Sequence, residues 1–243
     1  MKPSLRFQRH ELKYYLPEEM YPELLRLIRP YTAPDPYLDR SRVRSYLVRS
    51  LYLDTDDLRS YHDKLCGIRN RKKLRIRAYN QERSTVFLEI KRKYDNIIVK
   101  DRASVQIEEL PSLLDRYGGY RLNGGRSNAE NDVTMRFLSL IPALQLRPVL
   151  LIAYEREAYI GLFDDTARLT LDRNLRYLPG RSHDLFYSGR DWFSVKRPCI
   201  LELKFNRVLP FFFKHVIRRL NLWAQAISKY CLCIERCNPA FLK

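Results

Sequence analysis

Basic side chains recur at every second position in two neighbouring segments of the sequence. Lys73, Arg75 and Arg77 alternate with apolar residues in KLRIRAY, and Lys91 and Lys93 do so in TVFLEIKRK. Because successive side chains of a β-strand point to opposite faces, each segment predicts a strand with one cationic and one apolar face. Like charges on paired strands repel each other unless an anion lies between them. These two segments therefore predict a binding site for phosphate groups.

The same period of two places further basic residues in other strand-like segments. Lys100 follows in IIVKDRASV, Arg156 in LRPVLLIAYEREAYI, Arg168 in ARLTLDRNLRY, Lys204 in PCILELKFN, and Lys13 near the start in RFQRHELKYYL. Arginine and lysine are the side chains that bind phosphate oxygens best. We expect these residues to extend the same cationic surface.

Three carboxylates stand within these basic segments, at Glu11, Glu89 and Glu202. Divalent cations prefer oxygen ligands, so a few carboxylates among many cations are typical of a metal–phosphate site. The alternative for Glu202 is an ion pair with Lys204 or a nearby arginine. Glu11 and Glu89 have a similar alternative, in which each only orients a lysine or an arginine.

Other kinds of catalytic site have little support. The histidines, at positions 10, 62, 183 and 215, are far apart and show no metal-ligand spacing, and no serine or cysteine has an evident base partner. The chain contains neither the glycine-rich phosphate loop G-x-x-x-x-G-K-[ST] nor a kinase catalytic signature. The five cysteines match neither a disulfide scaffold nor a zinc site and are expected to be reduced. Cys231 and Cys233 alternate in a run that is expected to be buried.

Eight segments have strand periodicity, and helical segments flank them. The expected helices begin after Pro17 and Thr55 and cover much of 106–145 and 210–226. A closed antiparallel barrel would turn the charged strand faces inward around a hydrated lumen, whereas an open sheet would leave them in water. The alternation therefore predicts an α+β fold of about eight antiparallel strands with flanking helices. An eight-stranded antiparallel β-barrel is the closed arrangement of such strands, but alternation alone does not establish closure. The length fits one large domain or two small ones. The expected strands are 6–16, 44–54, 73–79, 85–93, 97–105, 146–160, 167–177 and 198–206.

The composition supports a folded, polyanion-binding protein. The 243 residues carry a net charge of +17, with 45% hydrophobic and 12% aromatic residues, enough for a core. The excess charge lies in two blocks, +9 over residues 64–102 and +10 over residues 173–243, which suggests that they converge on one feature. Such a surface attracts nucleic acid, an anionic membrane or phosphate-rich small molecules; a solvated basic surface without a partner is the alternative. No segment is apolar enough to cross a membrane, and the first residues lack the apolar core of a signal peptide, so we expect a cytoplasmic protein.

The ordered set of segments resembles a known family. HELKYYL, SLYLDTDDLRSYHDKL, KLRIRAY, VFLEIKRK, LRPVLLIAYEREAY, LTLDRNLRY, ILELKFN and SKYC follow one another as they do in the VTC domain, the catalytic polyphosphate polymerase domain of the vacuolar transporter chaperone complex. The resemblance covers roughly residues 5–235. The VTC domain is part of the CYTH or triphosphate tunnel metalloenzyme superfamily. The resemblance implies one domain over residues 1–243, folded as an eight-stranded antiparallel β-barrel tunnel with flanking helices. It also implies a basic tunnel wall and a glutamate on the last strand that holds Mn²⁺ or Mg²⁺.

The resemblance also assigns roles to individual residues. It implies that phosphate binding and catalysis depend on Lys13, Arg75, Arg77, Lys91, Arg156 and Arg168. Glu202 matches the metal-binding glutamate, with Glu11 and Glu89 as further metal ligands. Lys64 stands where the family usually has an arginine, and Lys229 matches a lysine near the C-terminal helix that closes one tunnel mouth. Together with these two, the residues expected to bind substrate or polyphosphate are Lys73, Lys93, Lys100 and Lys204.

The function implied is that of a polyphosphate polymerase, which transfers the γ-phosphate of ATP to a growing polyphosphate chain with a divalent metal. A tunnel triphosphatase is the first alternative, because Glu11 resembles the first-strand glutamate of those hydrolases more than the eukaryotic polymerase. A non-catalytic module that binds polyphosphate or RNA is the second alternative, although nucleic acid is the less expected partner. If the polymer crosses a membrane, a separate membrane partner must form the channel.

Overall fold

The computed structural model describes residues 9–36, 38, 44–80, 84–94, 97–115, 129–180, 184–196 and 198–237. The chain forms two compact units, each assembled from separate stretches of sequence. The first unit comprises Met1–Tyr46, Tyr154–Leu175 and Lys196–Ser228, and the second comprises Leu47–Ala153, Arg176–Val195 and Lys229–Lys243. The single domain expected over residues 1–243 stays a prediction.

The first unit is built on antiparallel strands. Strand β10 (Cys199–Asn206) pairs with β1 (Arg9–Leu16) on one side and with β8 (Arg168–Pro179) on the other. The short β2 (Thr32–Pro34) pairs with the C-terminal end of β7 (Arg147–Gly161). Alternate residues of the three long strands, Leu201 and Leu203 among them, form a core with two helices, while the other face carries the charged residues.

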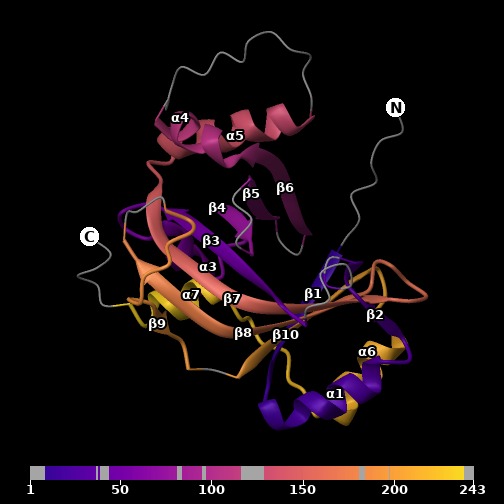
Figure 1. The fold of residues 1–243 in the computed structure, drawn as a ribbon. Coiled ribbons are helices and arrows are strands. Elements are labelled where there is room, and N and C mark those ends of the chain that lie inside the picture. Colours follow the sequence, from indigo (N-terminus) through magenta and orange to yellow (C-terminus); the bar gives the residue numbers. More distant parts are fainter. Residues whose placement is uncertain are drawn as a thin grey trace. The chain divides into compact units, whose positions relative to one another are not determined.

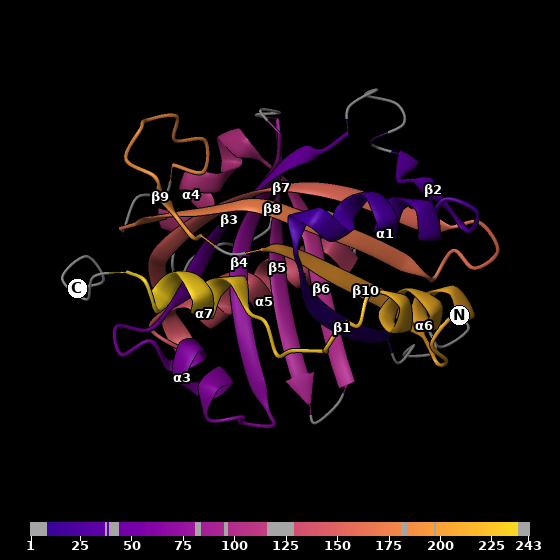
Figure 2. The ribbon, with the colours of Figure 1, turned by 90° about the horizontal axis from the view of Figure 1, so that it is seen from below.

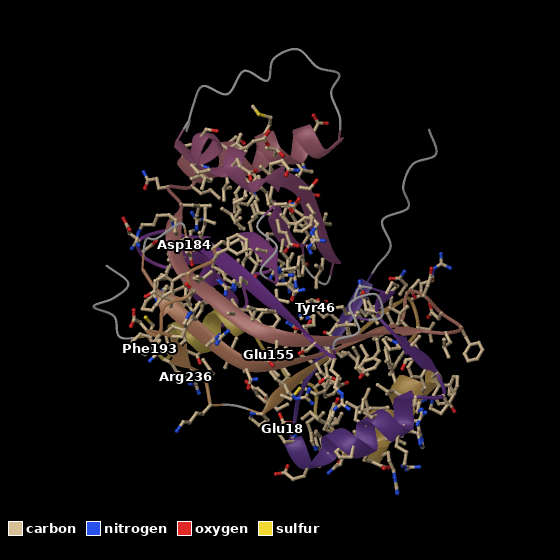
Figure 3. The ribbon with its side chains drawn as sticks, viewed as in Figure 1. Glu18, Tyr46, Glu155, Asp184, Phe193 and Arg236 are labelled. Carbon is tan, nitrogen blue, oxygen red and sulfur yellow. The ribbon has the colours of Figure 1, made fainter. Side chains whose placement is uncertain are left out.

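Two amphipathic helices cover the apolar face of the first unit. In α1 (Tyr21–Ile28), Leu24 and Ile28 are buried one helical turn apart, and in α6 (Phe211–Arg219), Phe212 and Val216 are buried at the same spacing. The two helices lie side by side in both views (Figures 1 and 2). The 3₁₀ turn η1 (Glu18–Met20) leads into α1, and Glu18, labelled in Figure 3, receives a hydrogen bond from Arg173 of β8.

The second unit contains a meander of four antiparallel strands in which β4 pairs with β3 and β5, and β5 pairs with β6. Their bounds are β3 (Tyr46–Asp54), β4 (Arg71–Tyr79), β5 (Thr85–Tyr94) and β6 (Ile97–Gln106). Their apolar face packs against η2 (Ile107–Glu109), α4 (Leu110–Asp115) and α5 (Ala129–Ala143). Figure 1 shows α4 and α5 beside β5 and β6. The opposite face of the meander carries the basic residues.

Three short elements complete the second unit. Helix α3 (Arg59–Leu65) contacts α7 (Lys229–Ile234) and β4. The two-residue β9 (Phe193–Ser194) pairs with the end of β8, and Phe193, labelled in Figure 3, stacks on Tyr177 with ring centroids 5.4 Å apart.

The predicted α+β architecture of antiparallel strands with flanking helices is confirmed, whereas closure of these strands into a barrel stays a prediction. The eight expected strands correspond to β1, β3, β4, β5, β6, β7, β8 and β10, with small shifts at their ends. The helix expected over 210–226 was too long, because α6 ends at Arg219 and Asn221 has a positive φ of 46° that no helix continues. Cys231 and Cys233 are buried as expected, on α7. Within the described ranges, no helix is both long and apolar enough to span a membrane.

Candidate functional site

The charged face of the meander in the second unit holds six cations around one carboxylate. We call this group the Glu89 cluster; it consists of Lys73, Arg75, Arg77, Glu89, Lys91, Lys100 and Arg102. In the register of the strands, Lys73 stands opposite Lys91, and Lys91 opposite Lys100. Three lysines thus form one row across three strands, and the next row is Arg75, Glu89 and Arg102.

Glu89 is the buried centre of this cluster, with its side chain 1% exposed. Its carboxylate lies 2.7 Å from Nε of Arg75, 2.6 Å from Nζ of Lys100, 3.0 Å from Nε of Arg102 and 3.7 Å from Nη1 of Arg77. Burial alone would raise the pKa of Glu89, but the surrounding cations outweigh burial and hold that pKa well below its usual value. Glu89 is therefore ionised, and its one negative charge lies within 4 Å of four basic side chains.

The lysines of the cluster have lowered pKa values. Burial is the main cause that lowers the pKa of Lys100 to about 7; Glu89 opposes this shift, and Arg75 and Arg77 add to it. Burial also lowers the pKa of Lys73. A bound anion would raise these pKa values again, because a nearby negative charge favours the charged form of each lysine.

A stack of two tyrosines supports the cluster from β3 and α7. The Tyr52 hydroxyl accepts a hydrogen bond of 3.0 Å from Nη1 of Arg75, and its ring stacks on that of Tyr230 at 5.0 Å. Tyr230 in turn donates a hydrogen bond of 2.7 Å to the buried Asp54, and the ammonium of Lys73 lies 5.0 Å from the Tyr230 ring. Hydrogen bonds and ring contacts therefore fix the position of Arg75 and Lys73.

Three further predicted substrate-binding residues also belong to the second unit. Lys229 is buried at the start of α7. Burial alone would raise the pKa of Tyr52, but the charges of Arg75, Arg77 and Lys229 outweigh burial and lower that pKa. Lys93 stands on the same strand face as Lys91, opposite Arg71. Lys64 is half-buried on α3. The phosphate-binding roles of Lys64, Lys93 and Lys229 stay predictions.

The first unit contains a second group of charges on the face of β1, β10 and β8 that is turned away from the helices, joined by Arg156 of β7 and Asp35 after β2. We call it the Glu202 cluster; it consists of Glu11, Lys13, Asp35, Arg156, Arg168, Thr170, Asp172, Glu202 and Lys204. One row across the three strands is Lys13, Glu202 and Thr170, and the next is Glu11, Lys204 and Arg168. The sequence-predicted residues of this region are thus brought together.

Lys13 links the two glutamates of the cluster. Its ammonium lies 3.0 Å from Oε1 of Glu11 and 3.4 Å from Oε1 of Glu202, and it donates a 3.2 Å hydrogen bond to the carbonyl of Ile227. Glu202 also contacts Nζ of Lys204 at 2.8 Å. Burial lowers the pKa of Lys204, and Glu202 opposes this shift. The two carboxylates therefore lie close enough to share one cation.

The two arginines of the Glu202 cluster are already paired with aspartates. Arg156 is buried and forms two parallel hydrogen bonds to Asp172, of 2.6 and 2.7 Å, with Glu202 3.8 Å away. Burial alone would lower the pKa of Arg156, but Asp172 outweighs burial and raises it. Arg168 forms an ion pair with Asp35. Phosphate bound by these arginines would have to share them with a carboxylate.

The donor atoms of the Glu202 cluster suit a divalent metal ion. Glu11 and Glu202 offer carboxylate oxygens, and the buried Oγ1 of Thr170, opposite Glu202 in the register, has no hydrogen-bond partner among the described residues. All three are oxygen donors, as Mg²⁺ and Mn²⁺ prefer. The described part of the chain has no group of three or more acidic, histidine or cysteine side chains placed to hold a metal, so phosphate oxygens would have to complete the coordination. The metal-binding role predicted for Glu89 stays a prediction, and its contacts are with four cations.

Several residues of these clusters were not among the predicted site residues. Arg102 stands two residues after Lys100, a spacing that could have revealed it. Asp172 shares a strand face with Arg168, but its pairing with Arg156 depends on the register of two strands. Tyr52, Asp54 and Tyr230 come together across 176 residues of sequence, and no local pattern indicates their contact.

Comparison with known proteins shows similarity to several solved structures. The PH1819 protein from Pyrococcus horikoshii OT3 is 14% identical, with 94% of this chain and 99% of that chain covered, at a TM-score of 0.48. A putative adenylate cyclase from Vibrio parahaemolyticus is 11% identical, with 94% and 98% covered, at 0.49. The putative adenylyl cyclase HpAC1 from Hippeastrum, described as having a dominant triphosphatase activity, is 13% identical, with 93% and 95% covered, at 0.48. Among curated proteins, no sequence matches the chain.

The family model of the VTC domain matches residues 8–238, almost the whole chain. The chain belongs to the VTC domain family. Membership links the chain to polyphosphate or triphosphate chemistry.

Proposed function

We propose that the protein is a metal-dependent polyphosphate polymerase that uses ATP as its phosphate donor. The observation that carries the proposal is the row of Lys73, Lys91 and Lys100, three cations directly opposite one another on paired strands. Such a row is unfavourable in an isolated sheet, and a chain of phosphates supplies the missing negative charge. The VTC domain family membership indicates that this anion is polyphosphate or a triphosphate.

In the proposed reaction, a terminal oxygen of the polyphosphate acceptor attacks the γ-phosphorus of ATP. The bond between the γ-phosphorus and the bridging oxygen breaks, ADP leaves with the electron pair, and the acceptor grows by one phosphate. Because the acceptor is already ionised, the protein needs to position and neutralise phosphates more than it needs a catalytic base. Arg75, Arg77, Lys91 and Lys100 are the groups of the Glu89 cluster that we assign to this task.

We assign the divalent metal, Mn²⁺ or Mg²⁺, to Glu202 and Glu11 of the Glu202 cluster. A bound metal would neutralise charge on the transferred phosphoryl group. Lys13, which bridges the two carboxylates, would then be released to bind a phosphate oxygen. Arg156 and Arg168 are assigned to phosphate contacts that they share with Asp172 and Asp35.

The test is a time course with purified protein, ATP and Mn²⁺ in which polyphosphate, ADP and orthophosphate are all measured. Polymer that accumulates together with ADP is the expected result. Glu202→Ala and Arg75→Ala should each abolish polymer formation. Lys214→Ala, on the exposed side of α6, is a matched control for loss of a positive charge and should leave it unchanged. Full polymer formation by Glu202→Ala or Arg75→Ala would refute the role of that residue.

A triphosphatase is the second candidate, and the observation in its favour is the closeness of Glu11 to Glu202, both bound to Lys13. A second carboxylate beside the metal position could orient a water molecule as the nucleophile. Release of orthophosphate from tripolyphosphate without chain growth would favour this reaction over the polymerase. Binding of polyphosphate or RNA without any product would instead leave a binding module.

A further inference from the structure

Phe87 is an apolar side chain on the charged face of the meander. On β5 it lies two residues before Glu89 and so points to the same side of the sheet. Its neighbours Val86 and Leu88, on the opposite face, are fully buried in the core, whereas Phe87 remains partly exposed. Core packing therefore does not explain an aromatic residue at this position.

Phe87 belongs to a layered group with Arg102 and Tyr79. The guanidinium carbon of Arg102 lies 4.0 Å from the centre of the Phe87 ring and 5.4 Å from that of Tyr79. The rings of Tyr79 and Phe87 meet edge to face, with their centroids 5.6 Å apart and an interplanar angle of 69°. Arg102 also contacts Oε1 of Glu89 at 3.0 Å, so the layered group is joined directly to the Glu89 cluster.

Small side chains stand beside Phe87 and Arg77 in the same row. Ser104 of β6 is opposite Phe87, and Ser50 of β3 is opposite Arg77. Ser104 is exposed. Arg77, on the other side of Phe87, is buried, whereas Phe87 is partly exposed and Arg102 is exposed. The Phe87–Arg102 pair therefore keeps surface that a planar ligand can reach.

Other aromatic residues near this sheet are not available for stacking in the same way. Tyr52 and Tyr230 stack on each other and are 8% and 2% exposed. Tyr94 is 41% exposed but lies an odd number of residues from Glu89, on the opposite face of β5. In the described parts of β4, β5 and β6, Tyr79 and Phe87 are the partly exposed aromatic residues of the charged face.

We propose that the Phe87–Arg102 pair is the binding site for the nucleobase of the donor nucleotide. The phosphates of the nucleotide would then extend along β5 toward Lys91, which is four residues, or about 13 Å, from Phe87. Aromatic rings and arginine planes both stack on bases, whatever the base, so ATP and GTP should bind alike. This inference rests on the proposed use of a nucleotide as donor and adds where its base is held.

The experiment compares ATP with inorganic tripolyphosphate, which has the phosphates but no base. Calorimetric titrations with Mg²⁺ present give both dissociation constants for the wild type, Phe87→Leu and Phe87→Tyr. Phe87→Leu should weaken ATP binding about tenfold and change tripolyphosphate binding less than twofold. Phe87→Tyr keeps the aromatic face and should bind both ligands as the wild type does. Intact tripolyphosphate binding also shows that a variant is folded.

A second variant makes the test independent of Phe87. Arg102→Lys keeps a positive charge near Glu89 but removes the planar guanidinium, and it should weaken ATP binding about threefold more than tripolyphosphate binding. Equal losses for the two ligands, or no loss of ATP binding in either Phe87→Leu or Arg102→Lys, would overturn the base site. Such a result would leave polymer formation from ATP untouched. Conversely, an ATP-specific loss in a protein that makes no polymer would support the base site and refute the polymerase.

Discussion

The two charged clusters differ in how far their charges are already balanced. In the Glu202 cluster, four cations face four carboxylates: Lys13, Arg156, Arg168 and Lys204 against Glu11, Asp35, Asp172 and Glu202. In the Glu89 cluster, six cations surround one carboxylate. Both stand on the charged face of an antiparallel sheet whose other face forms a core.

This difference indicates two ways of receiving phosphate. The members of the Glu89 cluster carry an excess of positive charge, and such an excess attracts an anion. The Glu202 cluster is neutral, so a phosphate or a metal ion can enter only by exchange, in which Lys13 or an arginine changes partner. Such a site favours a cation and an anion that arrive together, as a metal–phosphate complex does.

The largest expected effect comes from removing the one carboxylate of the Glu89 cluster. Glu89→Gln leaves Arg75, Arg77 and Lys100 around a neutral buried amide, and it should lower the free energy of unfolding by about 3 kcal/mol. Glu202→Gln should cost less, about 1 kcal/mol, because Lys13 keeps Glu11 as a partner. Urea unfolding at low salt measures both.

The same two variants also test whether the two clusters differ in charge balance. Tripolyphosphate should restore more stability to Glu89→Gln than to Glu202→Gln, because the added anion replaces the lost charge. Equal losses in the two variants, with equal recovery, would mean that the clusters do not differ in charge balance.

Metal addition should act through the Glu202 cluster alone. Mn²⁺ at a hundredfold excess over its dissociation constant should stabilise the wild type by about 2.7 kcal/mol, and a chelator should reverse this. Glu89→Gln should keep this stabilisation, whereas Glu11→Gln and Glu202→Gln should lose most of it. Thermal unfolding with and without Mn²⁺ provides the measurement. Loss of the metal effect in Glu89→Gln would instead support the metal role predicted for Glu89.

The sequence predicted the strand faces well because they depend on a local period of two. The alternation in KLRIRAY and TVFLEIKRK placed Arg75, Glu89 and Lys91 on one face, as the structure has them. The apolar face of each strand followed from the same pattern. The period of two is a property of the backbone, so it needs no knowledge of tertiary contacts.

The pairing of charges could not be predicted in the same way. Glu202 was expected either to bind metal or to pair with a lysine, and the structure shows Lys13 and Lys204 beside it. The hydrogen bonds from Arg156 to Asp172 depend on the strand register. The hydrogen bond from Tyr230 to Asp54 depends on the position of α7. These are properties of the tertiary structure, and the short helix α7 has no periodicity long enough to indicate it.

A smaller effect should appear in the pH dependence of anion binding by the Glu89 cluster. Because the pKa of Lys100 is lowered to about 7, lysine at this position is mostly neutral at pH 8 and half charged at pH 7. A bound anion favours the charged form, so tripolyphosphate binding should strengthen about fivefold as the pH falls from 8 to 7. The folding stability of the free protein changes in the opposite direction. Because the pKa of Lys100 is lower in the folded than in the unfolded chain, the stability that this residue contributes above its ordinary pKa is lost as the pH falls through 7.

Lys100→Arg separates this effect from titration of the ligand. Arginine stays charged throughout this range, so the variant should bind tripolyphosphate with almost no change between pH 8 and pH 7 beyond that due to the ligand itself. Calorimetric titrations at the two pH values give the comparison. The same fivefold change in Lys100→Arg would assign the pH dependence to another group.

The smallest expected effect concerns the tyrosine that holds Arg75. Tyr52→Phe removes the hydroxyl that accepts a hydrogen bond from Nη1 of Arg75 but keeps the ring that stacks on Tyr230. Arg75 retains Glu89 as a partner at 2.7 Å, so only part of what fixes its position is lost. We expect tripolyphosphate binding to weaken about threefold, in line with the loss of one modest hydrogen bond. Tyr177→Phe, whose hydroxyl donates to the carbonyl of Arg236, is the matched control and should bind as the wild type does. If Tyr52→Phe also binds normally, the Tyr52 hydroxyl does not position Arg75 for anion binding. The excess of positive charge in the cluster, rather than this fixed geometry, then determines anion binding.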